Sequence, residues 1–339
     1  MKARDDQPGN DNFPPSMTAM QVAQAYYSSP VFNQLANSDA KKLIKYLVAW
    51  AKHAYPFKSK WQTQLFDTLP IPVVKGIHGF FKAKNYPGFI ATRKAYIAQA
   101  VDQAILDGVE QVLVIGGGFD VMALMKHHHH PDVEFYELDR GPHQKMKQQA
   151  LHDLREETYP HADLQPLAVG LQKYAMLNVN MHFLEADLGE PGWESRLFDH
   201  GFNADKKTIC VGEGLTMYLS NAETVALLAS LTKILQEDSR LILSFIDPIE
   251  KSCSEKIRNH VLSETNETYK MRLAIDEVPE FMHQNGFSVM ESLSRIEIQK
   301  SLGLSESNMK KSVGLSENYY LSKPNHPGAT LQPVSSYKL

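Results

Sequence analysis

The chain has 339 residues, and 35 Lys plus Arg against 39 Asp plus Glu leave a formal net charge of −4. A hydrophobic content of 43% and a charged content of 22% are those of an ordinary globular protein with a large core. The acidic balance, without a dense stripe of Lys and Arg, argues against a nucleic-acid partner. No uncharged apolar run reaches the roughly 18 residues of a membrane span, so we expect no membrane partner.

Changes in amino-acid composition divide the chain into four parts. Residues 1–16 are rich in Asp, Asn, Pro and Gly, which predicts a disordered leader, and they lack the apolar segment of a signal peptide. Residues 17–90 carry apolar side chains at helical spacing between prolines, which predicts a helical cap or lid region. Residues 91–325 form the expected main domain, and 326–339 the C-terminal tail. Two cysteines are too few for a disulfide framework, so we expect a cytoplasmic protein.

Beyond Gly108, which is placed to end a helix, short apolar runs alternate with longer amphipathic segments. This alternation predicts an α/β fold with a parallel sheet covered by helices on both faces. Expected helices include 142–154 and 222–236. The expected strands are 111–115, 133–138, 180–184, 208–211 and 240–246, with 287–293 and 318–321 as late additions.

The most informative segment is QVLVIGGGFDVMAL, in which a predicted strand leads through three glycines into a predicted helix. Glycine permits a sharp turn and lets a ligand approach the backbone, and a helix start beyond it offers N–H groups. Gly116 and Gly118 are therefore candidate ligand contacts. The alternative is a tight turn that holds no ligand.

Asp139 ends the second predicted strand, about 20 residues after the glycines, a position that suits a carboxylate bound to a ribose diol. The alternative is a helix cap, and Glu137 is the weaker candidate. A dinucleotide and S-adenosylmethionine both fit such a site. The dinucleotide pattern needs a third glycine where Val121 stands, whereas S-adenosylmethionine has no phosphates and does not require it.

Three further polar residues lie near the ends of predicted strands or before the first one. Asp187 follows the third strand, Glu213 follows the fourth, and Arg93 lies in the helix before the first. Ligands of open α/β sheets bind at the carboxyl ends of the strands, so we expect these side chains to converge there with Asp139. An acidic group can accept from an adenine amino group, and an arginine can bind a carboxylate through two hydrogen bonds.

The motifs VIGGGFD, FYELDRGP, EADLGEPGW and GEGLTMYLS resemble those of the leucine carboxyl methyltransferase family, which includes O-methyltransferases of polyketide biosynthesis. The similarity extends over about residues 85–324. It implies a Rossmann-like class I S-adenosylmethionine-dependent methyltransferase. Such a protein has a seven-stranded, mostly parallel sheet with the last strand antiparallel, and an N-terminal helical cap.

The resemblance also implies a role for each matching position. The loop differs from the usual family pattern in having Gly117 for alanine, and Arg140-Gly141-Pro142 adds one residue before the proline. Arg93 is implied to bind the cofactor carboxylate, and Gly116 and Gly118 to line its methionine and ribose portion. Asp139 is implied to bind the ribose hydroxyls, and Asp187 and Leu188 to contact adenine. Glu213 is implied to lie near the methionine end.

The expected reaction is direct in-line transfer of a methyl group from S-adenosylmethionine, which becomes S-adenosylhomocysteine, to an oxygen of a small-molecule acceptor. A carboxylate acceptor needs no general base, whereas a hydroxyl acceptor would use one, such as a histidine. No catalytic residue is assigned. Tyr218 either faces the acceptor or packs in the core. Alternatives are a protein C-terminal carboxyl methyltransferase, an NAD-dependent dehydrogenase and an inactive cofactor-binding protein.

Four consecutive histidines, His127–His130, are the other conspicuous feature. Adjacent residues point in different directions, whereas metal ligands must converge, so we expect an exposed turn and no metal site. The sequence does not indicate the acceptor or the oligomeric state.

Overall fold

The computed structural model describes residues 17–28, 38–54, 86–177, 179–248, 269–303 and 317–325. The expected leader 1–16 and tail 326–339 lie outside the described residues, as does the middle of the expected cap region.

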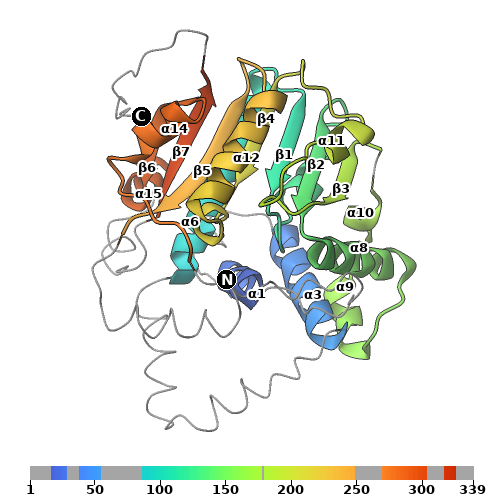
Figure 1. Ribbon diagram of the computed structural model, residues 1–339. Helices are drawn as coiled ribbons and strands as arrows, with labels where there is room; N and C mark the ends of the chain where they lie inside the picture. The colour runs from blue at the N-terminus through green and yellow to red at the C-terminus, as the bar shows by residue number, and fades with distance from the viewer. Residues whose placement is uncertain are drawn as a thin grey trace, which may run out of the picture.

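The described residues form one seven-stranded sheet with the strand order β3-β2-β1-β4-β5-β7-β6 (Figure 1). Strands β1 to β5 pair in parallel, and β7 runs antiparallel to both of its neighbours. This confirms the predicted α/β fold, with a mostly parallel sheet whose last strand is antiparallel. The strands are β1 (Gln111–Ile115), β2 (Glu134–Asp139), β3 (Met181–Glu185), β4 (Thr208–Gly212), β5 (Arg240–Ile246), β6 (Phe287–Ser294) and β7 (Glu317–Pro324).

The strand positions agree closely with the predicted apolar runs. β1 and β5 have the predicted bounds, while β2 and β3 are each displaced by one residue toward the C-terminus. β7 is longer than expected at both ends because it pairs on both sides, with β5 and with β6, as far as Pro324.

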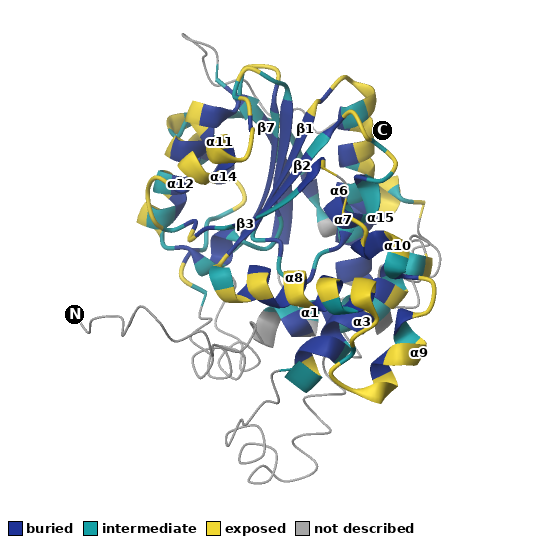
Figure 2. Ribbon diagram, turned by 90° about the vertical axis from the view of Figure 1, so that its right-hand side faces the viewer, coloured by how far each residue is buried: buried dark blue, intermediate teal, exposed yellow. Residues whose placement is uncertain are grey.

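Helices cover both faces of the sheet because each strand buries side chains on both sides (Figure 2). In β1, Val112 packs in the cluster that contains α6, whereas Leu113 packs in the cluster that contains α12. The helices are α1 (Met17–Ser28), α3 (Ser38–Ala54), α6 (Tyr86–Leu106), α7 (Met122–Lys126), α8 (Gly141–Glu156), η1 (Ala162–Leu164), α9 (Gln165–Ala168), α10 (Gln172–Ala175), α11 (Ser195–Asp199), η2 (Thr216–Tyr218), α12 (Asn221–Ile234), α14 (Val278–Gln284) and α15 (Arg295–Ser301).

The N-terminal helices α1 and α3 lie beneath the sheet in Figure 1, beside α8. They share an apolar cluster with α8 and with residues that follow β1. Polar contacts fix α3 to α8: the Trp50 indole donates to Asp153 at 2.8 Å, and the Tyr46 hydroxyl donates to the Ala150 carbonyl at 3.1 Å. Among the described helices, none combines the length and apolar character needed to cross a membrane.

Local signals explain where the helices next to the sheet begin and end. Gly108 has a φ of +87° and follows α6, which confirms the predicted helix end. Helix α8 begins at Gly141 with Pro142 in its first turn, where the missing N–H breaks no helical hydrogen bond. The additional residue before this proline therefore lengthens the approach to α8 without displacing Asp139 from the end of β2.

Candidate functional site

The predicted acidic residues follow three parallel strands at their carboxyl ends. Asp139 is the last residue of β2, Glu213 directly follows β4, and Asp187 follows β3 by two residues. β1 lies between β2 and β4. The chain adds β2 and β3 on one side of β1 and then crosses to add β4 and β5 on its other side. Such a reversal of strand order is where ligands of open α/β sheets bind.

The loop after β1 requires its glycines for two different reasons. Gly116 and Gly118 have φ values of +72° and +50°, a left-handed conformation that suits glycine. A Cβ atom on Gly117 would lie only 2.6 Å from the Cγ and Cδ atoms of Glu137. Glycine at position 117, where alanine was the expected family residue, therefore makes room for the Glu137 side chain.

The Asp139 carboxylate is held in a fixed orientation against this loop. The backbone N–H of Gly118 donates to Oδ2 at 2.6 Å, the N–H of Arg140 donates to Oδ1 at 2.7 Å, and the His143 ring contacts Oδ1 at 3.2 Å. Burial raises the pKa of Asp139, but His143 and the two N–H groups outweigh it, so the pKa lies below its ordinary value. The carboxylate is therefore ionised and oriented.

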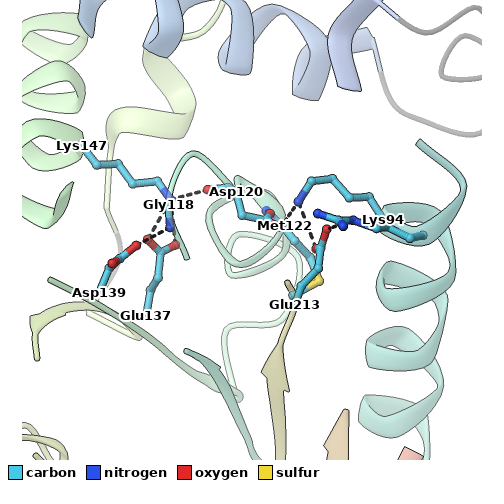
Figure 3. A network of polar contacts seen from close by, with 9 residues as sticks. Lys94, Gly118, Asp120, Met122, Glu137, Asp139, Lys147 and Glu213 are labelled. Atoms are coloured by element: carbon cyan, nitrogen blue, oxygen red, sulfur yellow. Dashed lines mark hydrogen bonds and ion pairs between the residues drawn. The ribbon is translucent and has the colours of Figure 1, made fainter. Parts of the chain in front are cut away.

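Glu137 lies two residues before Asp139 in β2 and is paired with Lys147 of α8. The Lys147 ammonium lies 2.8 and 2.9 Å from the two carboxylate oxygens, and both side chains are 1% exposed. Burial raises the pKa of Glu137 above its ordinary value, although Lys147 opposes this shift. Lys147 also donates to the Asp120 carbonyl oxygen, which ties α8 to the end of the glycine loop (Figure 3).

A second lysine joins the glycine loop to the end of β4. The Lys94 ammonium lies 2.6 Å from Asp120 and 3.1 Å from Glu213, as the dashed lines in Figure 3 show. Burial lowers the pKa of Lys94, but Asp120 and Glu213 outweigh it and keep the pKa above its ordinary value. Burial has the opposite effect on Asp120 and raises its pKa, but Lys94 and the N–H of Met122 outweigh this effect and bring the pKa below its ordinary value. Lys94 and Asp120 are therefore both charged.

Arg93 extends this chain of charges to the last strand. Its Nε donates to Glu213 at 2.6 Å, and its Nη1 donates at 3.0 Å to Glu317, the first residue of β7. The guanidinium is thus buried between two carboxylates from β4 and β7. The structure brings Arg93 and Glu213 together, as the sequence predicted, and it adds Lys94, Asp120, Lys147 and Glu317, which the sequence analysis did not assign.

Among the described residues, three carboxyl groups surround the two cationic side chains Arg93 and Lys94. They are those of Asp120, Glu213 and Glu317. The pairs Glu137–Lys147 and Asp139–His143 lie beside them. The sulfonium and ammonium groups of S-adenosylmethionine suit this acidic excess, and Arg93 offers a cation for its carboxylate, so the residues present fit this cofactor.

The two predicted adenine contacts differ in exposure. Asp187 is exposed, and its Oδ1 accepts from the N–H of Gly189 at 3.0 Å. Leu188 is buried and packs in the apolar cluster of α12. The backbone N–H of Ala186 donates to the Asp139 carbonyl at 2.9 Å, so this segment runs beside the end of β2. The side chain of Leu188 belongs to the core.

Helix α1 lies directly over the glycine loop. A Cβ atom on Gly118 would lie 3.4 Å from the Ala19 methyl group, and the ring of Tyr26 lies 5.6 Å from the Lys94 ammonium. Tyr218, in η2 just beyond Glu213, is half-buried with its ring against Tyr269 at 5.7 Å. The two predicted roles of Tyr218 both remain compatible with this position.

The four histidines follow α7 and form the predicted turn before β2, but the expected exposure holds only for His129, because His127 is buried and His128 and His130 are half-buried. Its Nδ1 contacts the Leu124 carbonyl at 2.9 Å, and the Asn180 amide donates to the carbonyl oxygens of His127 and His130. Burial lowers the pKa of His127 to about 4. Cys210 lies in β4 and is fully buried, and burial raises the pKa of its thiol.

The strand order and the antiparallel last strand are those of the Rossmann-like class I methyltransferase fold that the resemblance implied. The sequence profile of the leucine carboxyl methyltransferase family matches residues 12–232, so the chain belongs to this family. It is 27% identical over 194 residues to a provisionally named S-adenosyl-L-methionine-dependent methyltransferase of Parafrankia sp. strain EAN1pec. That match covers 57% of this chain and only 56% of the relative.

Solved structures with a similar chain path were also found. Magnesium protoporphyrin IX methyltransferase from Synechocystis PCC 6803 has a TM-score of 0.42 at 13% identity, over 70% of this chain and 85% of that one. Mitomycin 7-O-methyltransferase has a TM-score of 0.41 at 12% identity, over 88% and 76%. At these scores the likenesses add nothing to the family assignment.

The buried pair of Glu137 and Lys147 makes a prediction about stability. We expect Lys147→Met to lower the free energy of unfolding by about 3–5 kcal/mol, because it leaves the Glu137 carboxyl buried without its partner. The double variant Lys147→Met, Glu137→Gln should recover most of the loss. Urea denaturation measures both, and a loss below about 1 kcal/mol in the single variant would contradict the pairing.

Proposed function

We propose that the protein is an O-methyltransferase that uses S-adenosylmethionine to methylate a carboxylate or hydroxyl oxygen of a small-molecule acceptor. The observation that carries this proposal is the fixed Asp139 carboxylate, hydrogen-bonded to Gly118 beside the switch point of a leucine carboxyl methyltransferase family fold. The acidic excess around Arg93 and Lys94 supports a cofactor with positive charges.

Each predicted cofactor contact receives a role in this proposal. Asp139 would accept from the ribose hydroxyls, and the loop of Gly116 and Gly118 would let the nucleoside approach the backbone. Arg93 would bind the methionine carboxylate beside Glu213. Asp187 would face the adenine ring, and Leu188 would contribute its backbone, since its side chain is buried.

When bound, S-adenosylmethionine supplies a methyl group that is already activated by a positively charged sulfur. The protein then has to align an acceptor oxygen and exclude water, and such alignment can contribute on the order of 7–11 kcal/mol. We propose that the N-terminal helices form a lid that excludes water. Two residues of α1 support this proposal, since Ala19 lies against the glycine loop and the ring of Tyr26 lies against Lys94. Tyr218 is the proposed acceptor contact.

The cofactor assignment predicts selective binding. S-adenosylhomocysteine should raise the melting temperature of the protein, whereas NAD should not. We expect Asp139→Ala to weaken S-adenosylhomocysteine binding by about 1.5–3 kcal/mol, or roughly 10- to 150-fold, because it removes a charged hydrogen-bond acceptor. Isothermal titration calorimetry measures the affinity, with circular dichroism to verify folding.

Asp199→Asn, at the exposed end of α11, is the matched control and should bind like the unaltered protein. An unchanged affinity in Asp139→Ala would contradict the ribose assignment. Stabilisation by NAD would instead favour the dehydrogenase alternative.

The lid proposal predicts a kinetic effect at Tyr26. Removal of the ring in Tyr26→Ala uncovers Lys94 and should speed S-adenosylhomocysteine release roughly tenfold, equivalent to about 1.4 kcal/mol. Tyr26→Phe retains the ring and should release the ligand at the original rate. Stopped-flow measurement of dissociation tests this, and equal rates in the Ala variant and the unaltered protein would remove Tyr26 from the lid.

The acceptor class is tested by a screen with methyl-labelled S-adenosylmethionine against carboxylic acids, phenols and a peptide that ends in a leucine carboxylate. We expect label on a small molecule, and mild base distinguishes the products because it hydrolyses a methyl ester and leaves a methyl ether intact. Label on the peptide alone would replace the small-molecule proposal with C-terminal carboxyl methylation of a protein.

A further inference from the structure

Three metal-ligating side chains from distant parts of the chain meet on the surface, outside the candidate active site. His53 lies in the last turn of α3, His161 caps the start of η1, and Asp163 lies within η1. One ligand atom from each residue lies within 4.8 Å of the others. The Asp163 Oδ1 atom lies 3.0 Å from Nε2 of His53 and 2.6 Å from Nδ1 of His161.

The two imidazole rings are arranged alike around the carboxylate. Their planes are inclined by only 4° and their centroids lie 4.3 Å apart, so the rings are stacked with a nitrogen of each directed to the same carboxylate. Nε2 of His53 also lies 3.1 Å from the second oxygen, Oδ2. Electron pairs on a carboxylate oxygen and on an unprotonated ring nitrogen repel each other at these distances. Each contact therefore needs either a hydrogen on the ring nitrogen, which a neutral imidazole can carry, or a metal ion bound between the nitrogen and the oxygen.

The short contact of 2.6 Å between Nδ1 of His161 and Oδ1 of Asp163 has the length of a hydrogen bond. A metal ion can take the place of the hydrogen in such a contact, because it binds the electron pairs of the ring nitrogen and of the carboxylate oxygen together.

We propose that His53, His161 and Asp163 form a binding site for a divalent transition-metal ion of the Zn²⁺ type. Two imidazoles and one carboxylate are a ligand set that Zn²⁺ accepts, with water completing a tetrahedral arrangement. Mg²⁺ and Ca²⁺ prefer oxygen ligands and fit this set poorly. From the sequence we expected no metal site, since the four consecutive histidines, His127–His130, are neighbours whose side chains point in different directions.

Such an ion would fasten the N-terminal helices to the main domain. His53 belongs to α3, whereas His161 and Asp163 belong to the segment between α8 and β3. The same junction already holds the hydrogen bond from Tyr174 to Asp39 at 2.7 Å and that from Trp50 to Asp153. The site therefore serves the docking of α3 and takes no part in methyl transfer.

The test is metal binding by the full-length, tag-free protein after treatment with a chelator. Titration calorimetry with ZnCl₂ should show binding at this site, and ZnCl₂ should raise the melting temperature while MgCl₂ does not. His53→Ala, His161→Ala and Asp163→Asn should each weaken this binding at least tenfold. The double variant His129→Ala, His130→Ala is the matched control for the histidine turn and should retain the affinity.

Two results would overturn the proposal of a metal site. Zinc binding that persists unchanged in both His53→Ala and His161→Ala would place the ion elsewhere. Absence of binding at 100 µM ZnCl₂, far above the dissociation constant expected of a structural zinc site, would mean that hydrogen bonds alone join the three side chains. Circular dichroism of each variant without metal ensures that a lost signal reports binding rather than unfolding.

Discussion

The ammonium group of Lys94 lies between the carboxylates of Asp120 and Glu213, and the rest of the candidate site is arranged around this contact. Asp120 ends the glycine loop after β1 and Glu213 follows β4, so the contact ties together the two strands at which the chain order reverses. Burying these charges costs free energy that only their mutual neutralisation offsets. Arg93 and Lys147 continue the pairing on either side, and α1 shields it from solvent. The acidic excess that remains is the property a positively charged cofactor needs.

Much of the sheet and part of the site could be predicted from the sequence for a common physical reason. Strands of a parallel sheet bury both faces, so they appear in the sequence as continuous apolar runs. The bounds predicted for β1 and β5 from such runs are the bounds that the structure shows. Asp139 and Glu213 directly follow such runs, which determines the edge at which they lie. The N-terminal helices were likewise indicated by apolar spacing, but nothing in that spacing shows that α1 lies on the glycine loop.

The remaining site residues depend on contacts that no local pattern contains. Lys147 is indicated only weakly, by its place on the buried stripe of α8, because its partner Glu137 lies ten residues away in a strand. Glu317 reaches Arg93, 224 positions earlier, only because β7 is inserted between β5 and β6. His53 and Asp163 are 110 positions apart, and the docking of α3 alone brings them together.

The most direct test of this account is a crystal structure of the protein grown with S-adenosylhomocysteine. The account predicts the ribose hydroxyls within hydrogen-bonding distance of the Asp139 carboxylate, and the homocysteine end beside Arg93 and Glu213 under α1. A nucleoside bound elsewhere on the protein, or Lys94, Asp120 and Glu213 separated from one another in that crystal, would contradict it.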